Sequence, residues 1–506
     1  MNIKVKTGEI QQDHAELIVV NLFEGVTEPG GGATGAVDKA LGGQIRRLIA
    51  DGDFKGKAQE TALVYTNGVI PAKRVLVVGL GKEEEFGLEA IRVAAATAAK
   101  RVRALRVKSF STIIHGDRHG GISLADAVQA VVEGSELALY EFKELKTEPE
   151  DDPKEVNEMI FVVPDKSKRT EVEAAVEMGR EIVASVSLAR DLVNRPANYA
   201  TPTILAQCAQ EMADEFAISC RVLDEAKMGE LGMGALLAVA QGTDEPAKFI
   251  ILECNAGRDD LDTVVLVGKG VTFDSGGISL KDSKGMERAK GDMAGAAAVL
   301  GAMRAVAAQD LPLHVIGLAP TTENLPSGKA YKPGDVIRAM NGKTIEVVNT
   351  DAEGRMILAD ALAYAGRYQP NAVVDLATLT GAIFTALGDH AIGLFSNDDD
   401  LAASLEAAGQ TSFERVWRMP LFQEYGEQLK SHIADVKHVG GRSAGAITAA
   451  IFLSKFVGDF PWAHLDVGCK EWTDEDKPYT PKGATGVGVR LLIQFLRDWV
   501  HRENGE

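Results

Sequence analysis

The stretch "NTDAEGRMILAD", residues 349–360, places two carboxylates and a guanidinium directly before an apolar run. Asp351, Glu353 and Arg355 occupy every second position, and the continuation "MILADALAYAGRY" is nearly all apolar, which predicts a buried helix. Charges on a solvated surface need no explanation, but an unpaired carboxylate in a core is costly. The stretch therefore indicates charged groups that compensate one another at the edge of a core.

The sequence around this stretch has an α/β pattern. From about residue 191 to the end, apolar runs typical of strands alternate with helical stretches, and several runs are apolar on both faces, as in a parallel sheet covered by helices. The expected strands are "KFIILE", "TVVLVG", "LHVIGLA", "TIEVVNT", "AVVDLAT" and "WAHLDV". We therefore expect a larger α/β domain at 191–506, with a mixed, mostly parallel sheet covered by helices.

The chain of 506 residues is too long for one core, so we expect a second domain. Residues 1–165 alternate short strand-like runs, such as "RVLVVGLG", with helical stretches, which predicts a small amino-terminal α/β domain. Its charged segment "KELKTEPEDDPKEVNE" predicts an exposed loop. Residues 166–190 have helical periodicity and are expected to form a connecting helix.

Composition excludes several classes of protein. Hydrophobic residues make up 45% and charged residues 25%, which is typical of a globular domain, and nothing approaches 18 consecutive apolar residues. The start lacks the apolar core of a signal peptide, so we expect a cytoplasmic protein without membrane partners. The four cysteines form no C-x-x-C pair. A net charge of −19 argues against broad binding to nucleic acid.

Two further segments carry clustered charges. "VGKGVTFDSGGISLK" contains Lys269, Asp274 and Lys281 and follows the strand "TVVLV", and "KGDMAGAAAV" places Asp292 at the edge of an alanine-rich helix. The opening stretch follows "TIEVV", so two charged loops are expected at the carboxyl ends of strands, where open α/β sheets place their sites. The alternate spacing in the opening stretch suits an extended segment with its three charges on one side.

Four carboxylates in one place would need compensation, because they could not all stay ionised. Two divalent ions would neutralise the charges of Asp274, Asp292, Asp351 and Glu353. Oxygen-rich ligation suits Mg²⁺ or Mn²⁺, and Zn²⁺ also accepts carboxylates. No histidine lies in these segments, which excludes an H-E-x-x-H site. Two metals roughly 3.5–4 Å apart can activate a shared water, and Lys281 remains beside them to bind an anion or polarise a carbonyl, as does the arginine of the opening stretch.

Simpler interpretations remain for each feature taken alone. A loop carboxylate is usually a solvated surface charge, and Asp351 could merely cap the following helix. "GKG" and "SGG" could be turns. "VLVVGLGK" at 75–82 lacks the G-x-x-x-x-G-K-[ST] pattern and favours a plain strand and turn. "EPGGGATGAV" at 28–37 could cradle an anion or form a flexible loop.

The motifs together resemble those of the leucyl (cytosol) aminopeptidase family, bacterial type. The resemblance covers about residues 180 to 500, whereas the amino-terminal domain resembles the family's only in size and alternation. It rests on the motifs "NTDAEGRMILADAL", "VGKGVTFDSGGISLK", "GDMAGAAAV", "ENLPSGKAYKPGDV", "DLATLTGA" and "WAHLDV".

The resemblance implies a role for each matching residue. One metal ion, Mn²⁺ or Zn²⁺, would be held by Lys269, Asp274, Asp292 and Glu353. The other would be held by Asp274, Asp351 (side chain and main-chain carbonyl) and Glu353. Lys281 would polarise the scissile carbonyl, and Arg355 would hold a bicarbonate ion as the base. Arginine itself stays protonated in proteins and cannot be that base.

The resemblance also implies a homohexamer whose active sites face an interior cavity that admits only short peptides. One residue departs from the family's pattern: Ala289 stands where the family often has a methionine at the floor of the pocket for the first side chain. We therefore expect a dimetal aminopeptidase of intracellular peptide turnover that removes amino-terminal Leu and other, mostly apolar, residues.

Three alternatives to this interpretation remain open. Another two-metal hydrolase, such as a phosphoesterase, would usually show histidine among its ligands. Some members of the family also bind DNA, although the net charge of −19 weighs against that role here. A catalytically inactive scaffold is disfavoured because all seven expected site residues are present.

Overall fold

The computed structural model describes residues 1–116, 119–148 and 155–503, without the side chains of 501–503. The chain divides into two compact units. The first comprises Met1–Ala184 and Glu475–Lys482, and the second comprises Ser185–Asp474 and the chain from Gly483 onward. Helix α5 (Arg169–Asn194) begins three residues after the start of the connecting helix expected at 166–190 and continues four residues beyond its end.

The first unit has a six-stranded sheet in the order β1-β6-β5-β2-β4-β3, in which only β3 and β4 pair antiparallel. Alternate residues of β2 face a core formed with α1 and α2, while α3 and α4 pack together. Part of the loop expected at 143–158 lies outside the described residues. The elements are β1 (Asn2–Thr7), η1 (Ile10–Gln12), β2 (Leu17–Leu22), α1 (Gly32–Ala40), α2 (Gln44–Ala50), β3 (Thr61–Tyr65), β4 (Arg74–Gly79), η2 (Glu83–Glu85), α3 (Leu88–Ala104), β5 (Ser109–Thr112), α4 (Leu124–Leu139), β6 (Glu158–Val163) and η3 (Lys166–Lys168).

The second unit is built on a nine-stranded mixed sheet with the order β16-β15-β18-β14-β9-β11-β8-β7, and β10 pairs with β11. Its centre is parallel, because β18, β14, β9 and β11 run in the same direction. The strands are β7 (Ser219–Leu223), β8 (Lys248–Cys254), β9 (Thr263–Gly268), β10 (Gly270–Asp274), β11 (His314–Asn324), β14 (Ala372–Ala377), β15 (Ile392–Ser396), β16 (Val416–Arg418) and β18 (Trp462–Asp466). The expectation of a mostly parallel mixed sheet is confirmed.

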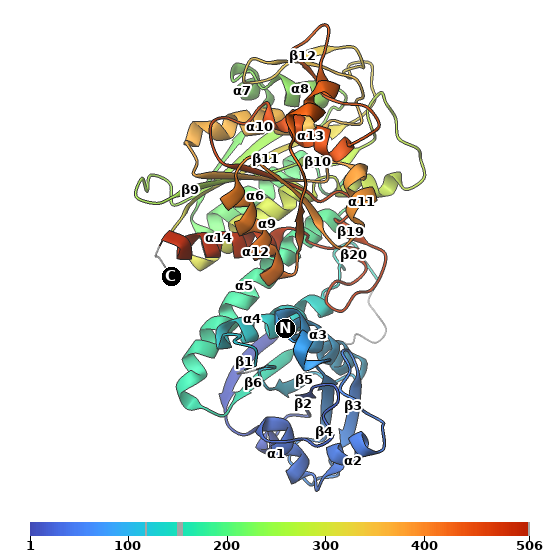
Figure 1. Ribbon diagram of the computed structural model, residues 1–506, viewed down its shortest axis with the longest axis vertical. Coiled ribbons are helices and arrows are strands. Elements are labelled where there is room, and N and C mark those ends of the chain that lie inside the picture. The colour runs from blue at the N-terminus through green and yellow to red at the C-terminus, as the bar shows by residue number, and fades with distance from the viewer. Residues whose placement is uncertain (117–118, 149–154, 504–506) are drawn as a thin grey trace. The chain divides into compact units, whose positions relative to one another are not determined.

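Helices cover both faces of this sheet (Figure 1). The two helices nearest the expected site, α9 and α10, are buried nearly all round, as their apolar sequences predict. The helices are α6 (Pro202–Phe216), α7 (Glu225–Glu230), α8 (Gly234–Ala240), η4 (Met286–Gly291), α9 (Ala294–Gln309), α10 (Gly354–Ala365), η5 (Gly366–Tyr368), α11 (Gly381–Leu387), α12 (Asp399–Ser412), η6 (Gln423–Leu429), α13 (Gly445–Ser454) and α14 (Val489–Glu503). Within the described residues, no helix is long and apolar enough to cross a bilayer.

One expected strand belongs elsewhere. The run "TIEVVNT" forms only β13 (Thr344–Glu346), which pairs with β12 (Val336–Arg338) and β17 (Val436–Lys437) in a small separate sheet. The last small sheet pairs β19 (Trp472–Thr473) with β20 (Gly483–Ala484). The charged stretch at 349–360 therefore does not leave a strand of the main sheet, and that expectation was wrong.

Candidate functional site

The site lies at the carboxyl ends of neighbouring parallel strands of the second unit. Lys269 follows β9 directly, Asp274 is the last residue of β10, and Thr378 follows β14. Strand β9 pairs in parallel with both β14 and β11, and β10 pairs in parallel with β11. The sheet thus brings side chains from distant parts of the sequence to one edge, as open α/β sheets do.

The stretch at 349–360 approaches this edge through the start of α10. Glu353 is the N-cap of the helix and has helical dihedral angles (φ −70°, ψ −33°), and Arg355 lies in the first turn. The expected extended arrangement was therefore wrong, because the helix begins before the apolar run does. Asp351 is not the helix cap, and the N-cap residue makes no side-chain capping hydrogen bond.

Three carboxylates meet at this edge, one from the end of β10 and two from the segment before α10. One oxygen from each of Asp274, Asp351 and Glu353 lies within 4.8 Å of the others. Asp292, which directly follows η4, is linked to this group by Lys269, whose ammonium group pairs with both Asp292 and Glu353. All seven residues expected from the sequence line one cavity of about 210 Å³: Lys269, Asp274, Lys281, Asp292, Asp351, Glu353 and Arg355.

Lys269 is buried at the centre of the site. Its Nζ lies 2.7 Å from Oδ1 of Asp292 and 2.9 Å from Oε1 of Glu353, and it donates to the carbonyl of Thr378 at 2.8 Å. Burial alone would lower the pKa of this amine, but the adjacent carboxylates raise it above its usual range. An added cation next to the amine would reverse this effect and favour the neutral form that can act as a ligand.

Lys281 is the second cation of the cavity and is only partly buried. Its Nζ lies 2.6 Å from Oδ2 of Asp274 and also pairs with Asp351. Burial opposes the charged form, yet the two carboxylates raise the pKa of the lysine above its usual range. The ammonium group is thus held at the open side of the carboxylate cluster.

The carboxyl groups differ in how readily they ionise. Burial, together with the charge of Glu353, raises the pKa of Asp274 to about 6. Burial also raises the pKa of Asp292 well above its usual value. Glu353 is buried as well, but the charges of Lys269 and Lys281 lower its pKa to about 2. Such spreading of pKa values is expected where like charges share a site and marks it as a functional candidate.

Arg355 also lines the cavity and is buried. One terminal nitrogen donates to the carbonyl of His438 at 2.7 Å, whereas Nε is buried and makes no hydrogen bond among the described residues. Burial lowers the pKa of the guanidinium to about 10, which still leaves it charged at neutral pH. A charged group with an unused donor is suited to holding an anion.

Several supporting residues were not identified from the sequence. The Asn324 amide donates to Oδ1 of Asp274 at 2.8 Å and to the carbonyl of Thr350 at 2.9 Å, and the Thr378 hydroxyl donates to Oδ1 of Asp292 at 2.7 Å. Position 378 could have been found, because it directly follows an apolar strand of the parallel sheet. Asn324 ends strand β11 and lies in the motif "ENLPSGKAYKPGDV", although it was given no role from the sequence, whereas no local signal marks the cavity-lining Glu471.

The carboxylate cluster fits divalent metal ions. Oδ2 of Asp292 and Oε2 of Glu353 are buried and have no hydrogen-bond partner among the described residues. Leaving buried charged oxygens unpaired is costly, and a cation between them would satisfy both. The donor set of carboxylate oxygens and one amine suits Mn²⁺ and Zn²⁺.

The structure does not place Ala289 at the floor of this cavity. Ala289 lies in η4, and its carbonyl accepts the amide of Asp292 at 3.4 Å, but it is not among the described residues that line the cavity.

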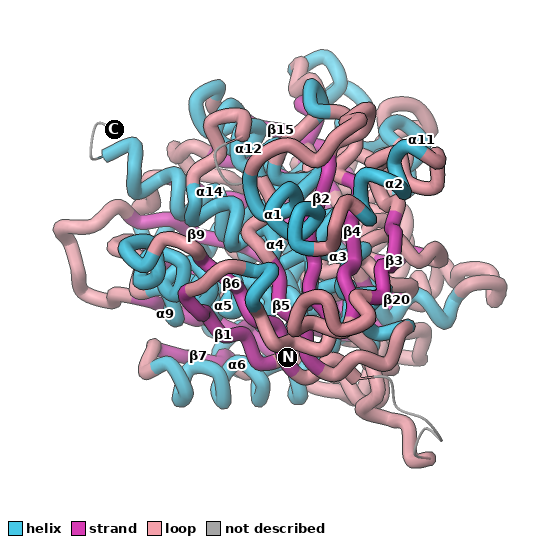
Figure 2. Tube along the Cα trace, turned by 90° about the horizontal axis from the view of Figure 1, so that it is seen from below, coloured by secondary structure: helices cyan, strands magenta, loops and turns pink. Residues whose placement is uncertain are grey.

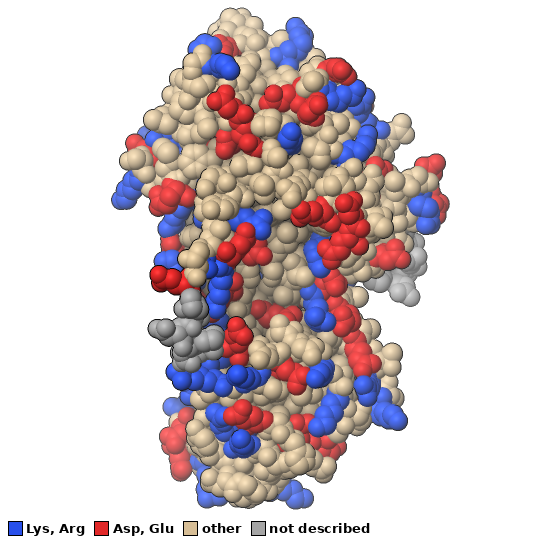
Figure 3. Space-filling view, turned by 180° about the vertical axis from the view of Figure 1, so that it is seen from behind, with Lys and Arg blue, Asp and Glu red and all other residues tan. Residues whose placement is uncertain are grey.

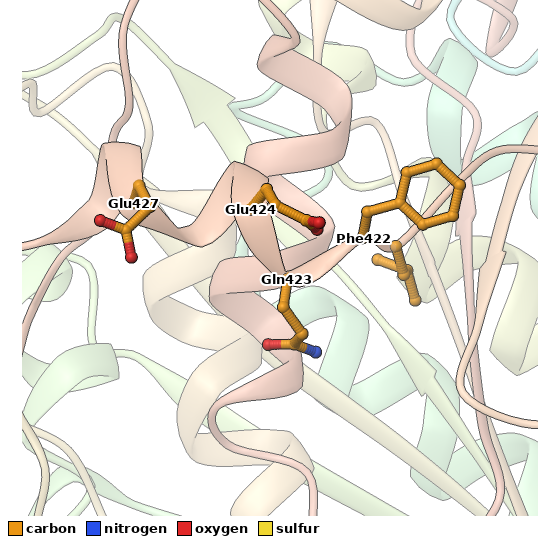
Figure 4. A pocket seen from close by; sticks show the side chains of 5 residues that line it. Phe422, Gln423, Glu424 and Glu427 are labelled. Atoms are coloured by element: carbon orange, nitrogen blue, oxygen red, sulfur yellow. The ribbon is translucent and has the colours of Figure 1, made fainter.

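A second hollow, of about 600 Å³, lies over η6 (Figure 4). It is lined by Leu421, Phe422, Gln423, Glu424 and Glu427 and includes none of the seven site residues.

Comparisons with known proteins agree on one family. The family profile of the catalytic domain of the cytosol aminopeptidases matches residues 187–493, and the profile of their amino-terminal domain matches residues 19–149. A probable cytosol aminopeptidase of Roseiflexus castenholzii is 48% identical over 99% of both chains. Another, of Geotalea uraniireducens, is 50% identical over 91% of this chain and 92% of its own.

Solved structures give the same result. The bottromycin maturation enzyme BotP in complex with Mn superposes with a TM-score of 0.84 at 35% identity, covering 96% of this chain and all of that one. A mutant of tomato leucine aminopeptidase superposes with a TM-score of 0.86 at 33% identity, covering 98% of this chain and 96% of its own. The expected two-domain α/β architecture is confirmed by this likeness.

Proposed function

Because the chain belongs to the cytosol aminopeptidase family, and is thus a metal-dependent aminopeptidase, we propose that it uses two divalent ions to remove the amino-terminal residue from short peptides. Leu and other, mostly apolar, residues are the proposed first residues. One ion is held by Lys269, Asp274, Asp292 and Glu353. The other is held by Asp274, Asp351 and Glu353, with the main-chain carbonyl of residue 351 as a further ligand.

The observation that carries the proposal is the pair of buried carboxylate oxygens, Oδ2 of Asp292 and Oε2 of Glu353, that have no partner among the described residues and that a cation would satisfy. The manganese in the BotP complex supports Mn²⁺ as one candidate, and Zn²⁺ is the other. When bound, divalent ions supply Lewis-acid charge and a water molecule of lowered pKa. The geometry around that cluster supports the roles proposed below for the chain's own residues.

Lys281 is proposed to stabilise the charge that develops on the scissile carbonyl oxygen. Its ammonium group lies within 2.6 Å of Asp274, so a carbonyl positioned over the carboxylate cluster would come within reach of the same group. A preorganised cation in a partly buried cavity is worth more than the same charge in solution. Lys281 is thus assigned to electrostatic stabilisation rather than to metal binding.

Arg355 is proposed to hold a bicarbonate ion that accepts a proton from the attacking water. The unused Nε donor and the persistent positive charge support this assignment. The hydrogen bond to the carbonyl of His438 fixes the orientation of the guanidinium and therefore the direction in which its Nε–H group points. The arginine therefore orients the base and cannot itself replace it.

The proposal extends to assembly and location. A homohexamer is proposed, and it is supported by large apolar side chains that are exposed on this single chain around η6, among them Trp417, Phe422 and Ile433. A cytoplasmic location is proposed from the name of the relatives. DNA binding is not proposed, because basic and acidic side chains are interspersed on the face drawn in Figure 3 and the net charge is −19.

The test uses metal-stripped protein refilled with Mn²⁺, Zn²⁺, Co²⁺ or Mg²⁺. Hydrolysis of a panel of amino-acid anilides should return with two ions bound per chain, as measured by elemental analysis. Glu353→Ala should lose both metal and activity. Removing a residue that only supports a metal ligand costs up to about 100-fold in activity, so removing a ligand itself should cost at least that much. A fully active enzyme with a metal content near zero would refute the dimetal proposal.

A further inference from the structure

The amino-terminal unit contains a cavity that the aminopeptidase reaction does not use. Its volume is about 500 Å³, within the range of roughly 300–1,000 Å³ that small-molecule sites occupy. It is lined mainly by apolar groups, together with a glycine-rich loop, an aromatic pair and two charged residues, Asp165 and Lys168. None of the seven residues of the catalytic site belongs to it.

The cavity lies where the connections of the sheet diverge. Strands β2 and β5 are parallel neighbours, but the chain leaves β2 toward β3 and β4 on one side and leaves β5 toward β6 on the other. Residues that end β2 (Asn21, Leu22) and residues that follow β5 (Ile113, Ile114) line the cavity. Such a switch point, at the carboxyl ends of parallel strands, is where open α/β sheets bind ligands.

The glycine-rich loop opens α1, which packs against β2 (Figure 2). Its sequence Gly30-Gly31-Gly32-Ala33-Thr34-Gly35 has the G-x-G-x-x-G spacing. A methyl group on Gly35 would lie 1.7 Å from the carbonyl oxygen of Gly30, so only glycine allows the loop to fold so tightly onto the helix. The loop is longer than the tight turn of dinucleotide-binding folds, so the spacing alone carries no assignment.

The same loop leaves backbone donors at the cavity. Gly31 is the N-cap of α1 and offers no side-chain cap, so the first amides of the helix lack the usual internal acceptor. A Cβ atom added at Gly30 or Gly31 would meet no atom within 4 Å, and both residues line the cavity. The backbone is thus open to a close approach by an anion, as phosphate sites require.

Phe23 and His119 supply aromatic rings to the cavity, and the planes of the two rings are tilted by 41° to each other. Their rings lie 4.8 Å apart between centroids, and Phe86 packs edge-on against Phe23 at 5.0 Å, which fixes the orientation of the pair. Both Phe23 and His119 line the cavity. An aromatic surface of this kind can stack on a planar ring.

We propose that this cavity binds a nucleoside diphosphate, with its phosphates at the Gly30–Gly32 backbone and its base against Phe23 and His119. The proposal combines the volume, the position at the switch point, the open backbone donors and the aromatic surface. It is independent of the proposed catalytic mechanism, because the two sites share no residue.

The test measures binding of ADP to the full-length, metal-loaded protein by titration calorimetry in excess Mg²⁺, so that ADP does not strip the catalytic metals. Gly31→Leu fills the open space in front of the loop and should weaken ADP binding about tenfold or more. Gly31 has an extended backbone (φ −72°), so the substitution introduces no backbone strain. Gly30→Leu serves as a second variant if Gly31→Leu does not fold.

The matched control is Gly87→Leu. Gly87 is also an N-cap glycine without a side-chain cap, has an extended backbone and faces open space, but it does not line the cavity. This variant should bind ADP like the unmodified protein. All these variants should keep the unmodified rate of anilide hydrolysis.

Three results would overturn the proposal. Equal ADP affinity in both loop variants would exclude the cavity. Loss of ADP binding in Glu353→Ala, with binding kept in Gly31→Leu, would place the nucleotide at the metal centre. Inorganic pyrophosphate or adenosine binding as tightly as ADP would show that the site does not recognise a nucleotide. Weaker binding of both fragments supports it.

Discussion

The absence of a side chain at Gly354 leaves space for the buried Lys269 of the site. A methyl group on Gly354 would lie 2.5–2.7 Å from Cδ, Cε and Nζ of Lys269, closer than carbon atoms can approach. Alanine is otherwise preferred to glycine in a helix by about 1 kcal/mol. The glycine in the first turn of α10 therefore leaves space for the lysine, although it makes the helix less stable than alanine would.

Gly354→Ala should consequently displace Lys269 and reduce bound metal and kcat together, although helix propensity alone would predict stabilisation. The control is Gly229→Ala in α7, where the nearest atom to the added methyl is 3.9 Å away. That variant should keep both its metal and its activity. Metal content by elemental analysis and anilide hydrolysis check both variants, and a fully loaded, active Gly354→Ala would contradict the expected displacement of Lys269.

Lys281 and Arg355 should behave differently from the metal ligands. Lys281→Ala should lower kcat by roughly 10²–10³ while metal content stays unchanged, since one electrostatic stabiliser is typically worth that factor. Arg355→Ala should cost less, and added bicarbonate should restore part of its rate. Release of metal from Lys281→Ala, with normal turnover of what remains, would contradict the proposed role.

At the scale of elements, helix α10 carries a second buried carboxyl group that ties three segments together. Asp360 is fully buried and accepts the amides of Leu236 at 2.9 Å and Met340 at 2.8 Å. These bonds hold the start of α8 and the turn after β12 against the helix. Burial raises the pKa of Asp360 to about 7 despite the two amides.

This shift predicts a pH dependence with a definite sign. The folded pKa lies above the ordinary value of 3.8, so between pH 4 and 7 the folded state binds the proton more tightly than the unfolded state. Stability should therefore fall as pH rises through this window, by at most about 1.4 kcal/mol per pH unit. The stability difference between the wild type and Asp360→Asn should shrink from pH 5 to pH 7, measured by thermal unfolding. A constant difference would mean that Asp360 is ionised throughout.

The elements also show what the sequence could predict. Buried helices and central strands such as α9, α10, β9 and β14 were identified because their apolar runs have no alternative location. Strand β1 was missed, since "NIKVKT" alternates with lysines and its side chains are largely outside the core. The strand expected at 344–350 was placed in the wrong sheet, because apolar character does not specify a partner.

Part of the site, like part of the fold, could be predicted from the sequence. Residues next to predicted strand ends or helix starts could be grouped, and the fold does bring all seven around one cavity. Their catalytic roles remain proposals. Asn324 was not singled out, although it lies in a quoted motif at the end of β11, because an uncharged amide was not considered for the site. Glu471 was not found, because nothing in the sequence distinguishes it from the other charges of "KEWTDEDK". The start of α10 was misjudged because a helix can begin with polar residues that face a site.

At the scale of the whole molecule, the exposed apolar surface around η6 predicts self-association. Trp417, Phe422 and Ile433 are 63%, 64% and 62% exposed on the single chain. Exposing such side chains to water is unfavourable, and aromatic residues of this kind are enriched in protein interfaces. A second copy of the chain is the proposed partner.

Sedimentation at low micromolar concentration should therefore give the mass of six chains. Phe422→Asp and Trp417→Asp would each place a charge in a desolvated contact, which commonly costs several kcal/mol when the charge is left unpaired, so both should shift the protein toward smaller species. Tyr65→Asp is the matched control, because Tyr65 is an equally exposed aromatic residue (60%) in the first unit, far from η6 in sequence. A wild-type chain that sediments as a monomer would refute the hexamer. A hexamer that both aspartate variants preserve would place the interface elsewhere, and the apolar surface around η6 would then need another explanation.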